Sequence, residues 1–396
     1  MKTKLRTIEG GVCAPKGFAA AAISAGIKYP VGQRDDMALV VADEPCAAAA
    51  TFTTNKVQAA PVLVSKEHLR SRRCRGVILN SGNANACTGE PGVANARAMT
   101  AAVATELGVK PEEILVCSTG RIGVPLPIEK MLAAVPALAA GLGAHSEEAA
   151  RAIMTSDTVH KEAAREFTSN GRKFRVGGIA KGAGMIDPNM ATMLAVITTD
   201  AAFSKAELQR RLRTAVERSF NRITIDGDMS TNDTVILLAS GAQGVPDGDD
   251  FQEALDSVAL DLAMKIVLDG EGVTRFIEVE VRGAKNTKDA RLAAEAIANS
   301  TLTKCAWAGG DPNWGRILDA AGYSGAALDP NKVSIDYDKV PAVRGGMPAK
   351  TPFARLEAVA KKKAFKVTVD LHLGAASYTV FTTDLTEAYV NFNLGE

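Results

Sequence analysis

Short runs rich in valine, isoleucine and threonine alternate along the chain with longer segments of helical periodicity. The runs predict strands at 38–42, 76–79, 114–116, 174–176, 194–198, 223–225, 235–238, 276–281, 365–373 and 378–382. In the run 365–373, Val367, Val369 and Leu371 alternate with polar residues, which is typical of a strand with one solvated face. The segment 374–377 supplies a turn, so the last two runs predict an antiparallel hairpin.

The clearest predicted helix begins after Ser204. Ser204 and Glu207 form a capping box, which satisfies free backbone N–H groups at a helix start. An apolar stripe with i, i+4 spacing follows, at Leu208, Leu212, Val216 and Phe220. Similar patterns predict helices at 95–107, 127–142, 147–153, 250–268 and 287–297.

These elements predict an α+β fold in which mixed or antiparallel sheets are layered with helices. Paired strands without an intervening helix, as predicted within 223–238, argue against a doubly wound parallel sheet. A chain of 396 residues exceeds the usual size of one domain, so two or three compact units are expected.

Composition narrows the classes of partner. The 46 Lys and Arg residues nearly balance the 45 Asp and Glu residues, so the net charge is +1, which disfavours nucleic acids and anionic membranes as partners. The 46% apolar and 23% charged residues are typical of a globular protein. Residues 1–10 carry charges and no apolar core of a signal peptide, and we therefore expect a cytoplasmic protein.

The cysteines and histidines do not have metal-ligand spacing. None of the six cysteines belongs to a C-x-x-C pair, and the four histidines are scattered. We therefore expect no metal site and no disulfide framework. Most of the cysteines are predicted to be buried, inert thiols.

The most unusual segment is 181–194, which reads KGAGMIDPNMATML. Gly177 and Gly182 have the spacing of a phosphate-binding loop, but Ala183 and Gly184 stand where that motif requires Lys and then Ser or Thr. A dinucleotide-binding fingerprint fails as well, because Asp187 replaces its third glycine and Pro188 interrupts the helix that should follow.

A threonine that opens a buried strand after such a bend also suits nucleophilic chemistry. If the Ala191–Thr192 peptide bond is strained, the Thr192 hydroxyl attacks the preceding carbonyl, and hydrolysis of the resulting ester frees a new N-terminus. The freed amine has a pKa of about 7.7–8.0 and serves as base for its own hydroxyl. From spacing alone, however, a threonine between alanine and methionine at the start of a strand is a packing residue in most proteins.

The segment resembles the self-processing motif of the ornithine acetyltransferase family, the glutamate N-acetyltransferases. The resemblance runs through the whole chain, in ordered blocks at 14–18, 51–55, 80–89, 226–234, 269–272 and 311–316. It implies an α/β/β/α-type sandwich that is similar to the N-terminal-nucleophile folds.

The resemblance further implies self-cleavage between Ala191 and Thr192, giving an α chain of residues 1–191 and a β chain of 192–396. Thr192 is then the nucleophile that carries the acetyl group, and Thr119 and Gly120 form the oxyanion hole. The implied substrate-binding residues are Thr155, Lys181, Thr192, Glu271 and Asn393. Lys181 and Glu271 supply the two signs of charge that an amino-acid substrate requires.

The chain departs from the family pattern in three places. The family pattern of Tyr-Val, two further positions and Asn is matched by residues 389–393, so Asn393, not Asn391, is the matching asparagine. After it the chain stops at Glu396, without the Ser or Thr that usually contacts the substrate. Arg121 and Met229 replace a small apolar residue and a threonine that are common in the family.

The activity implied is a ping-pong transfer of acetyl from N2-acetylornithine to glutamate in arginine biosynthesis, without metal or cofactor. Acetyl-CoA as a second donor stays open, and a heterotetramer of two α and two β chains is implied. Two alternatives remain: an N-terminal-nucleophile amidase or aminopeptidase, in which water resolves the acyl-enzyme, and a non-catalytic amino-acid-binding protein on the same scaffold.

Overall fold

The protein folds into two compact units that share the chain in alternating pieces. The computed structural model describes residues 4–71, 73–187 and 193–394. Of these, unit 1 takes the residues up to 182, 193–221 and 229–266, and unit 2 takes 183–187, 222–228 and 267–394. The expectation of two or three units is confirmed, although neither unit is a continuous stretch of sequence.

Unit 1 is built on a nine-stranded sheet in the order β1-β6-β7-β8-β9-β3-β4-β5, with β2 paired to β3. Its strands are β1 (Arg6–Thr7), β2 (Phe18–Ile23), β3 (Met37–Phe52), β4 (Cys74–Asn80), β5 (Ile114–Ser118), β6 (Lys161–Ser169), β7 (Arg172–Lys181), β8 (Leu194–Ala201) and β9 (Thr234–Gly244). Its helices are α1 (Ala60–His68), α2 (Gly89–Leu107), α3 (Ile128–Ala140), α4 (Ser146–Ala152), α5 (Lys205–Arg218) and α6 (Gly248–Leu268), with 3₁₀ turns at Gly11–Cys13, Pro111–Glu113 and Phe220–Arg222.

The long strand β3 divides this sheet into two halves that face each other. Residues 37–42 of β3 pair with β2 and β4, whereas residues 47–52 pair with β9. One cluster of buried side chains joins both halves, including Val40 and Leu79 from one half and Val196 and Ile236 from the other. The hydrophobic effect therefore closes the two halves into a sandwich.

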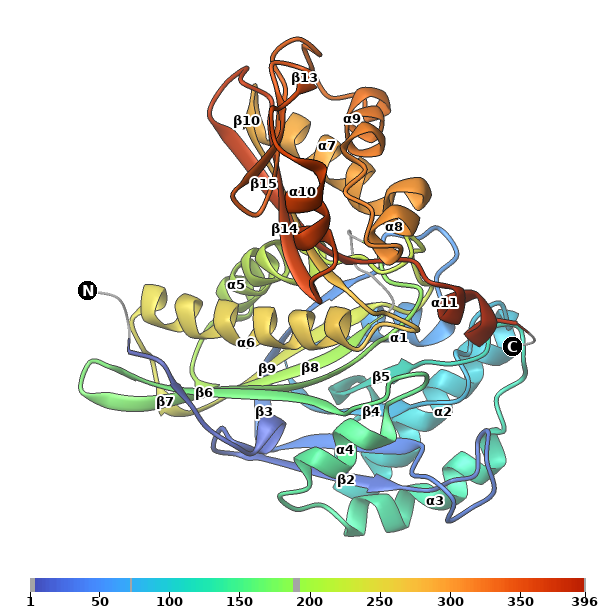
Figure 1. The fold of residues 1–396 in the computed structure, drawn as a ribbon. Coiled ribbons are helices and arrows are strands. Elements are labelled where there is room, and N and C mark those ends of the chain that lie inside the picture. Colours follow the sequence, from blue (N-terminus) through green and yellow to red (C-terminus); the bar gives the residue numbers. More distant parts are fainter. Residues whose placement is uncertain (1–3, 72, 188–192, 395–396) are drawn as a thin grey trace. The chain divides into compact units, whose positions relative to one another are not determined.

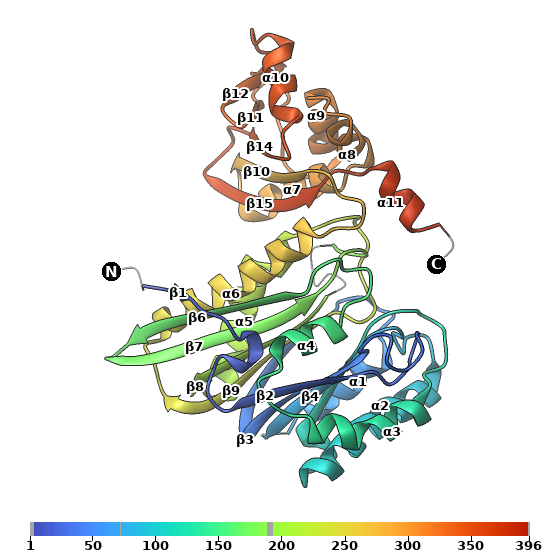
Figure 2. The same ribbon diagram turned by 60° about the horizontal axis from the view of Figure 1, so that its bottom comes forward.

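Helices cover both outer faces of unit 1. Figures 1 and 2 show α5 and α6 along the half that contains β6–β9, and α2 and α3 along the half that contains β4. A second apolar cluster joins Met99 and Val103 of α2, and Met131 and Val135 of α3, to β4 and β5. The predicted α/β/β/α layering is confirmed in this unit.

Most predicted elements of unit 1 are confirmed. The Ser204 hydroxyl accepts a hydrogen bond from the Glu207 amide, and α5 begins at Lys205, directly after Ser204, as the capping box predicts. The strand predicted at 223–225 is wrong: Ile223 and Ile225 are buried, but Ile223 makes only an isolated bridge to Phe381. The pairing expected within 223–238 is wrong too, because β9 pairs in parallel with β8 across α5.

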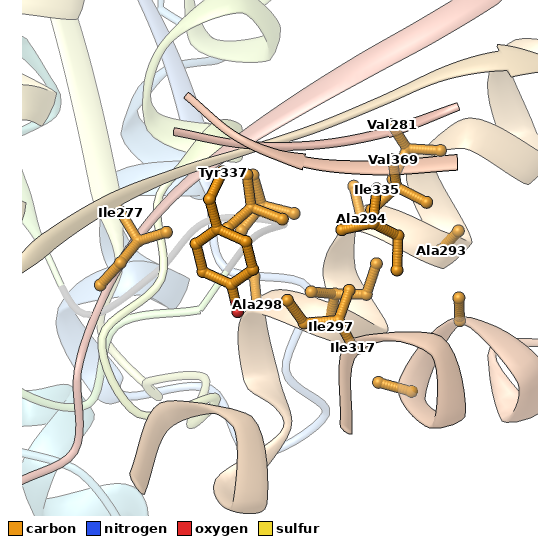
Figure 3. Close-up of a cluster of buried hydrophobic side chains, with 14 of the residues drawn as sticks. Ile277, Val281, Ala293, Ala294, Ile297, Ala298, Ile317, Ile335, Tyr337 and Val369 are labelled. Atoms are coloured by element: carbon orange, nitrogen blue, oxygen red, sulfur yellow. The ribbon is translucent and has the colours of Figure 1, made fainter. Parts of the chain in front are cut away.

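Unit 2 contains a six-stranded sheet in the order β13-β12-β11-β14-β10-β15. The strands are β10 (Phe276–Ala284), β11 (Ser334–Tyr337), β12 (Val340–Arg344), β13 (Met347–Pro348), β14 (Ala364–Asp370) and β15 (Ala376–Thr383). The helices are α7 (Thr287–Asn299), α8 (Thr301–Ala308), α9 (Trp314–Tyr323), α10 (Phe353–Ala360) and α11 (Glu387–Phe392). Figure 3 shows Ile297 of α7 and Ile317 of α9 in the core beneath Ile335, Tyr337 and Val369.

The hairpin predicted for residues 365–382 is wrong. β14 and β15 do not pair with each other, because β10 lies between them, parallel to β14 and antiparallel to β15. The connection after β14 crosses the end of β10, where the Leu371 amide donates to the Arg282 carbonyl. Ile277, Val279 and Val281 of β10 are fully buried, as an interior strand of this sheet requires.

None of the helices in the described ranges has the length and apolar character needed to cross a bilayer.

The core of unit 2 gives a direct test of its packing. We expect Ile297→Ala to lower the free energy of unfolding of unit 2 by about 2–4 kcal/mol, because it leaves a cavity in a fully buried cluster. Leu302→Ala is the control, since Leu302 is 59% exposed. Both tryptophans, Trp307 and Trp314, belong to unit 2, so urea titration followed by tryptophan fluorescence reports on this unit. Equal midpoints for the two variants would contradict the assignment of the core.

Candidate active site

The predicted cleavage residues, Ala191 and Thr192, lie outside the described residues. The chain is described again from Met193, which directly precedes β8. The remaining predicted site residues form two groups, one in each unit: Thr119, Gly120, Thr155 and Lys181 belong to unit 1, and Glu271 and Asn393 to unit 2.

Lys181 binds the two predicted threonine hydroxyl groups of unit 1. It is the last residue of β7 and is only 2% exposed. Its Nζ donates to Thr155 Oγ1 at 2.7 Å and to Thr119 Oγ1 at 3.2 Å. Three of the predicted residues, from segments far apart in the sequence, thus meet at one ammonium group.

Asp157 supports this cluster and was missed in the sequence. One carboxylate oxygen accepts the Thr155 amide at 3.0 Å, and the other accepts Lys161 Nζ at 2.7 Å and the Gly182 amide at 2.6 Å. Burial alone would raise the pKa of Asp157, but the charges of Lys181 and Lys161 outweigh it and lower the pKa below its usual value. Asp157 therefore stays ionised as the counter-charge of two buried lysines.

The Thr119–Gly120 pair follows β5 and lies tightly against the loop after β4. The Thr119 amide donates to the Asn80 carbonyl at 3.0 Å. Gly120 has φ +132°, and a Cβ there would collide with the backbone of Gly82 and Asn83. Only glycine fits this position. The Thr119–Gly120 pair therefore packs directly against the backbone of the asparagine-rich block 80–89.

Unit 2 brings Glu271 and Asn393 together. Glu271 follows α6, and its amide donates to the Ala183 carbonyl at 2.9 Å. Asn393, just after α11, donates from Nδ2 to Glu271 Oε2 at 3.0 Å. A Cβ on Gly184 would overlap the Glu271 carboxylate, so the glycine of the KGAG sequence leaves room for this acid.

Two aspartates fasten the segment 183–187 within unit 2. Asp226 accepts the amides of Met185 at 2.6 Å and Ile186 at 2.9 Å, and also the Tyr389 hydroxyl at 3.1 Å. Asp187 accepts Asn299 Nδ2 at 2.8 Å, and burial raises the pKa of Asp187 to about 6. The chain is thus anchored in unit 2 directly before the segment that contains the predicted cleavage position.

The start of β8 is anchored in unit 1 instead. The Met193 amide donates to Asp233 Oδ1 at 2.9 Å, and the Thr234 amide donates to the Met193 carbonyl at 3.1 Å. Leu194 is the register partner of Lys181 on β7 and of Thr234 on β9. The residue two positions after Thr192 therefore lies beside Lys181.

The site residues offer charged and hydrogen-bonding groups for binding a substrate. In the described part of the chain, no three or more His, Cys, Asp or Glu side chains are grouped as metal ligands. In unit 1, one ammonium group and two hydroxyls suit a carboxylate or an oxyanion, and in unit 2 a carboxylate and an amide suit an ammonium group.

Asp157 can be tested directly. We expect Asp157→Asn to destabilise unit 1 by about 3–5 kcal/mol, because it removes a buried carboxylate that pairs with Lys161 and lies in the field of Lys181. Because the pKa of Asp157 is lower in the folded state, its contribution is present above the unfolded-state value near 4 and is lost as the pH falls through the folded value. Hydrogen exchange of peptides covering β6 and β7 measures the effect.

The control for Asp157 is Asp256→Asn, which removes a partner of the exposed Arg218 and should change stability by less than about 1 kcal/mol. Similar exchange in both variants would rule out a supporting role for Asp157.

Comparison with known proteins identifies the family. The model of the ArgJ family matches residues 19–395. The arginine biosynthesis bifunctional protein ArgJ of Geobacter sulfurreducens is 51% identical over 96% of this chain and 98% of its own length, and that of Symbiobacterium thermophilum is 46% identical over 98% of both chains.

Among solved structures, the ornithine acetyltransferase of Mycobacterium tuberculosis, complexed with ornithine, is 42% identical. It covers 47% of this chain and 98% of its own, with a TM-score of 0.43. The family model and the full-length relatives agree with the resemblance found in the sequence: this chain belongs to the ArgJ family, the ornithine acetyltransferases of arginine biosynthesis.

Proposed function

We propose that this protein cleaves itself between Ala191 and Thr192 and transfers acetyl groups from N2-acetylornithine to glutamate through Thr192. The observation that carries the proposal is the cluster at the end of β7, in which the buried Lys181 binds the hydroxyls of the buried Thr119 and the half-buried Thr155. Lys181 is paired in register with Leu194, so β8, the strand that follows Thr192 in the sequence, begins beside the implied binding residue Lys181.

Each transfer exchanges one acyl bond for another. The Thr192 Oγ attacks the amide carbonyl carbon of N2-acetylornithine while its proton moves to the Thr192 α-amine. The tetrahedral intermediate collapses, the C–N bond breaks, and the ornithine amine leaves with that proton. The glutamate amine then attacks the acetyl ester and gives up a proton to the Thr192 α-amine. The C–Oγ bond breaks, Oγ takes that proton back, and N-acetylglutamate leaves. This arrangement needs no histidine, because the terminal amine is the base.

Lys181 prepares the hydroxyl groups for these steps. An ammonium group has donors only, so Thr119 Oγ1 and Thr155 Oγ1 both accept from Lys181, and their own protons point elsewhere. Thr119 can therefore donate to the oxygen of the tetrahedral intermediate, together with the Gly120 amide. A donor of this kind contributes about 3–4 kcal/mol to transition-state stabilisation.

The substrates are amino acids with charges at both ends. Lys181 and Thr155 suit a carboxylate, and Glu271 with Asn393 suits an ammonium group, which are the two kinds of charged group that ornithine carries. The relative from M. tuberculosis was solved with ornithine bound, which supports a substrate of this class.

The first test is Thr192→Ala. We expect the variant to remain one chain and to transfer no measurable acetyl, because both steps use the same hydroxyl. Intact-mass spectrometry measures cleavage, and conversion of labelled glutamate measures transfer. Thr105→Ala, on the surface of α2, is the control and should behave like the wild type. An intact, active wild-type enzyme would refute the mechanism. Hydrolysis of acetylornithine that greatly exceeds transfer would favour the amidase.

The second test concerns the cleaved chains. β8 and β9 would belong to the β chain, yet they lie between β7 and β3 of the α chain. We expect the two chains to elute together in size-exclusion chromatography and to separate only in denaturant, because separation would break two rows of ladder hydrogen bonds and open the core. Dissociation in native buffer would contradict this.

An assembly of two α and two β chains, a cytoplasmic location and the use of acetyl-CoA as a second donor belong to the same proposal. Relatives that are named bifunctional support the second donor. Mass measurement by light scattering, cell fractionation and an assay with acetyl-CoA as the sole donor address these points separately.

A further inference from the structure

Unit 2 contains a second group of side chains that suits nucleophilic catalysis and that the acetyl transfer described above does not use. Ser334 Oγ lies 3.0 Å from His372 Nε2, and His372 Nδ1 lies 3.3 Å from Asp370 Oδ1. Both distances are short enough for hydrogen bonds. A hydroxyl, an imidazole and a carboxylate in this order form the arrangement by which a serine becomes a nucleophile.

The register of the sheet places these residues side by side. Ser334 begins β11 and is the register partner of Asp370 at the end of β14, and Asp370 is also the register partner of Arg282 on β10. Their chain neighbours Ile335 and Val369 belong to the apolar core. Because side chains alternate along a strand, Ser334 and Asp370 lie together on the opposite face of the sheet.

The carboxylate of Asp370 orients the imidazole. Its Oδ1 also accepts the His372 amide at 3.1 Å, and its Oδ2 accepts Arg282 Nε at 2.8 Å. A carboxylate offers acceptors only, so it favours the tautomer of His372 that carries the proton on Nδ1. Nε2 then has a lone pair for the proton of the Ser334 hydroxyl.

The backbone holds His372 in an uncommon conformation. Its φ is +50°, in the left-handed region that residues other than glycine rarely adopt. The amides of Leu371 and Leu373, on either side of it, donate to carbonyls of β10 at 2.9 and 2.7 Å. Gly283 on β10 has φ +65°, and a Cβ there would collide with the Asp370 carboxylate. Backbone strain of this kind is concentrated at functional sites.

The group is reachable from solvent on the side of the imidazole. The His372 side chain is 49% exposed, whereas Ser334 is only 9% exposed, so packing fixes the hydroxyl while water can reach the base. Nη1 and Nη2 of Arg282 make no hydrogen bond to any residue in the described ranges. They are available to stabilise the negative oxygen of a bound acyl group.

We propose that Ser334, His372 and Asp370 form a second acyl-transfer site, which hydrolyses carboxylic esters. Ser334 Oγ attacks the carbonyl carbon of the ester, and its proton moves to His372 Nε2. The ester C–O bond breaks, the alcohol leaves with that proton, and the acyl group stays on Oγ. Water then attacks the acyl carbon and gives a proton to Nε2. The bond to Oγ breaks, Oγ takes this proton, and the carboxylic acid leaves.

The test uses the full-length Thr192→Ala protein, so that the proposed nucleophile of acetyl transfer contributes no signal. We expect a fluorophosphonate probe, which reacts with activated serines, to label Ser334, as located by mass spectrometry of peptides. We expect the same protein to hydrolyse p-nitrophenyl acetate. Adding Ser334→Ala should remove the label, and adding His372→Asn should slow labelling and hydrolysis about 100-fold or more. Asparagine tolerates the left-handed conformation, so this change preserves the backbone.

The control is Ser377→Ala in the same background. Ser377 is an exposed serine on β15, in the same unit. Its loss should leave the labelling of Ser334 and the rate of hydrolysis at the values of the Thr192→Ala protein. Tryptophan fluorescence establishes that unit 2 is folded in each variant, because both tryptophans belong to it.

Two results would overturn the proposal: no label on Ser334 in the folded Thr192→Ala protein, or labelling and hydrolysis that His372→Asn leaves unchanged. If Ser334→Ala does not fold, the His372→Asn rates decide alone. If His372→Asn does not fold, an unchanged rate of hydrolysis in Ser334→Ala overturns the proposal. None of these results depends on the function proposed above, which is measured on the wild type with N2-acetylornithine and glutamate.

Discussion

The buried charge cluster of Asp157, Lys161 and Lys181 is the interaction on which the rest of unit 1's site depends. The Asp157 carboxylate forms a buried ion pair with Lys161, and the charges of both lysines lower the pKa of Asp157 so that it stays ionised. That carboxylate also holds the amides of Thr155 and Gly182, which fixes the hydroxyl on one side of Lys181 and the glycine that follows it. The same ion pairing thus supports the fold and shapes the polar groups offered to a substrate.

The sequence predicted the residues that face a substrate better than the aspartates that hold them in place. Thr119, Thr155 and Lys181 were predicted from motifs and meet as one cluster, and Glu271 and Asn393 meet as another. Asp157 and the role of Asp226 were missed, because a carboxylate that binds backbone amides leaves no periodic pattern in the sequence. A possible signal for Asp157 was the Lys four residues later, in a stretch otherwise poor in charge.

For the fold, too, the local elements were predicted better than the long-range contacts between them. Local rules predicted α5 correctly, down to its Ser204 cap, and located most of the longer strands and helices. They failed where pairing is decided at long range: β10 lies between β14 and β15, which look like a hairpin in the sequence. They also predicted a strand at Ile223 and Ile225 that does not form. These side chains are apolar because they are buried in the core, and their backbone does not join a sheet beyond one isolated bridge.

The long-range pairing of β3 has a consequence for biosynthesis. The second half of β3 pairs with β9, which emerges from the ribosome about 180 residues later, or roughly 10–40 seconds at usual translation speeds. Until then an apolar strand edge waits unpaired, which is the condition that recruits chaperones or leads to aggregation. Met193 likewise waits for Asp233, 40 positions downstream, so its anchoring belongs to a late stage of translation.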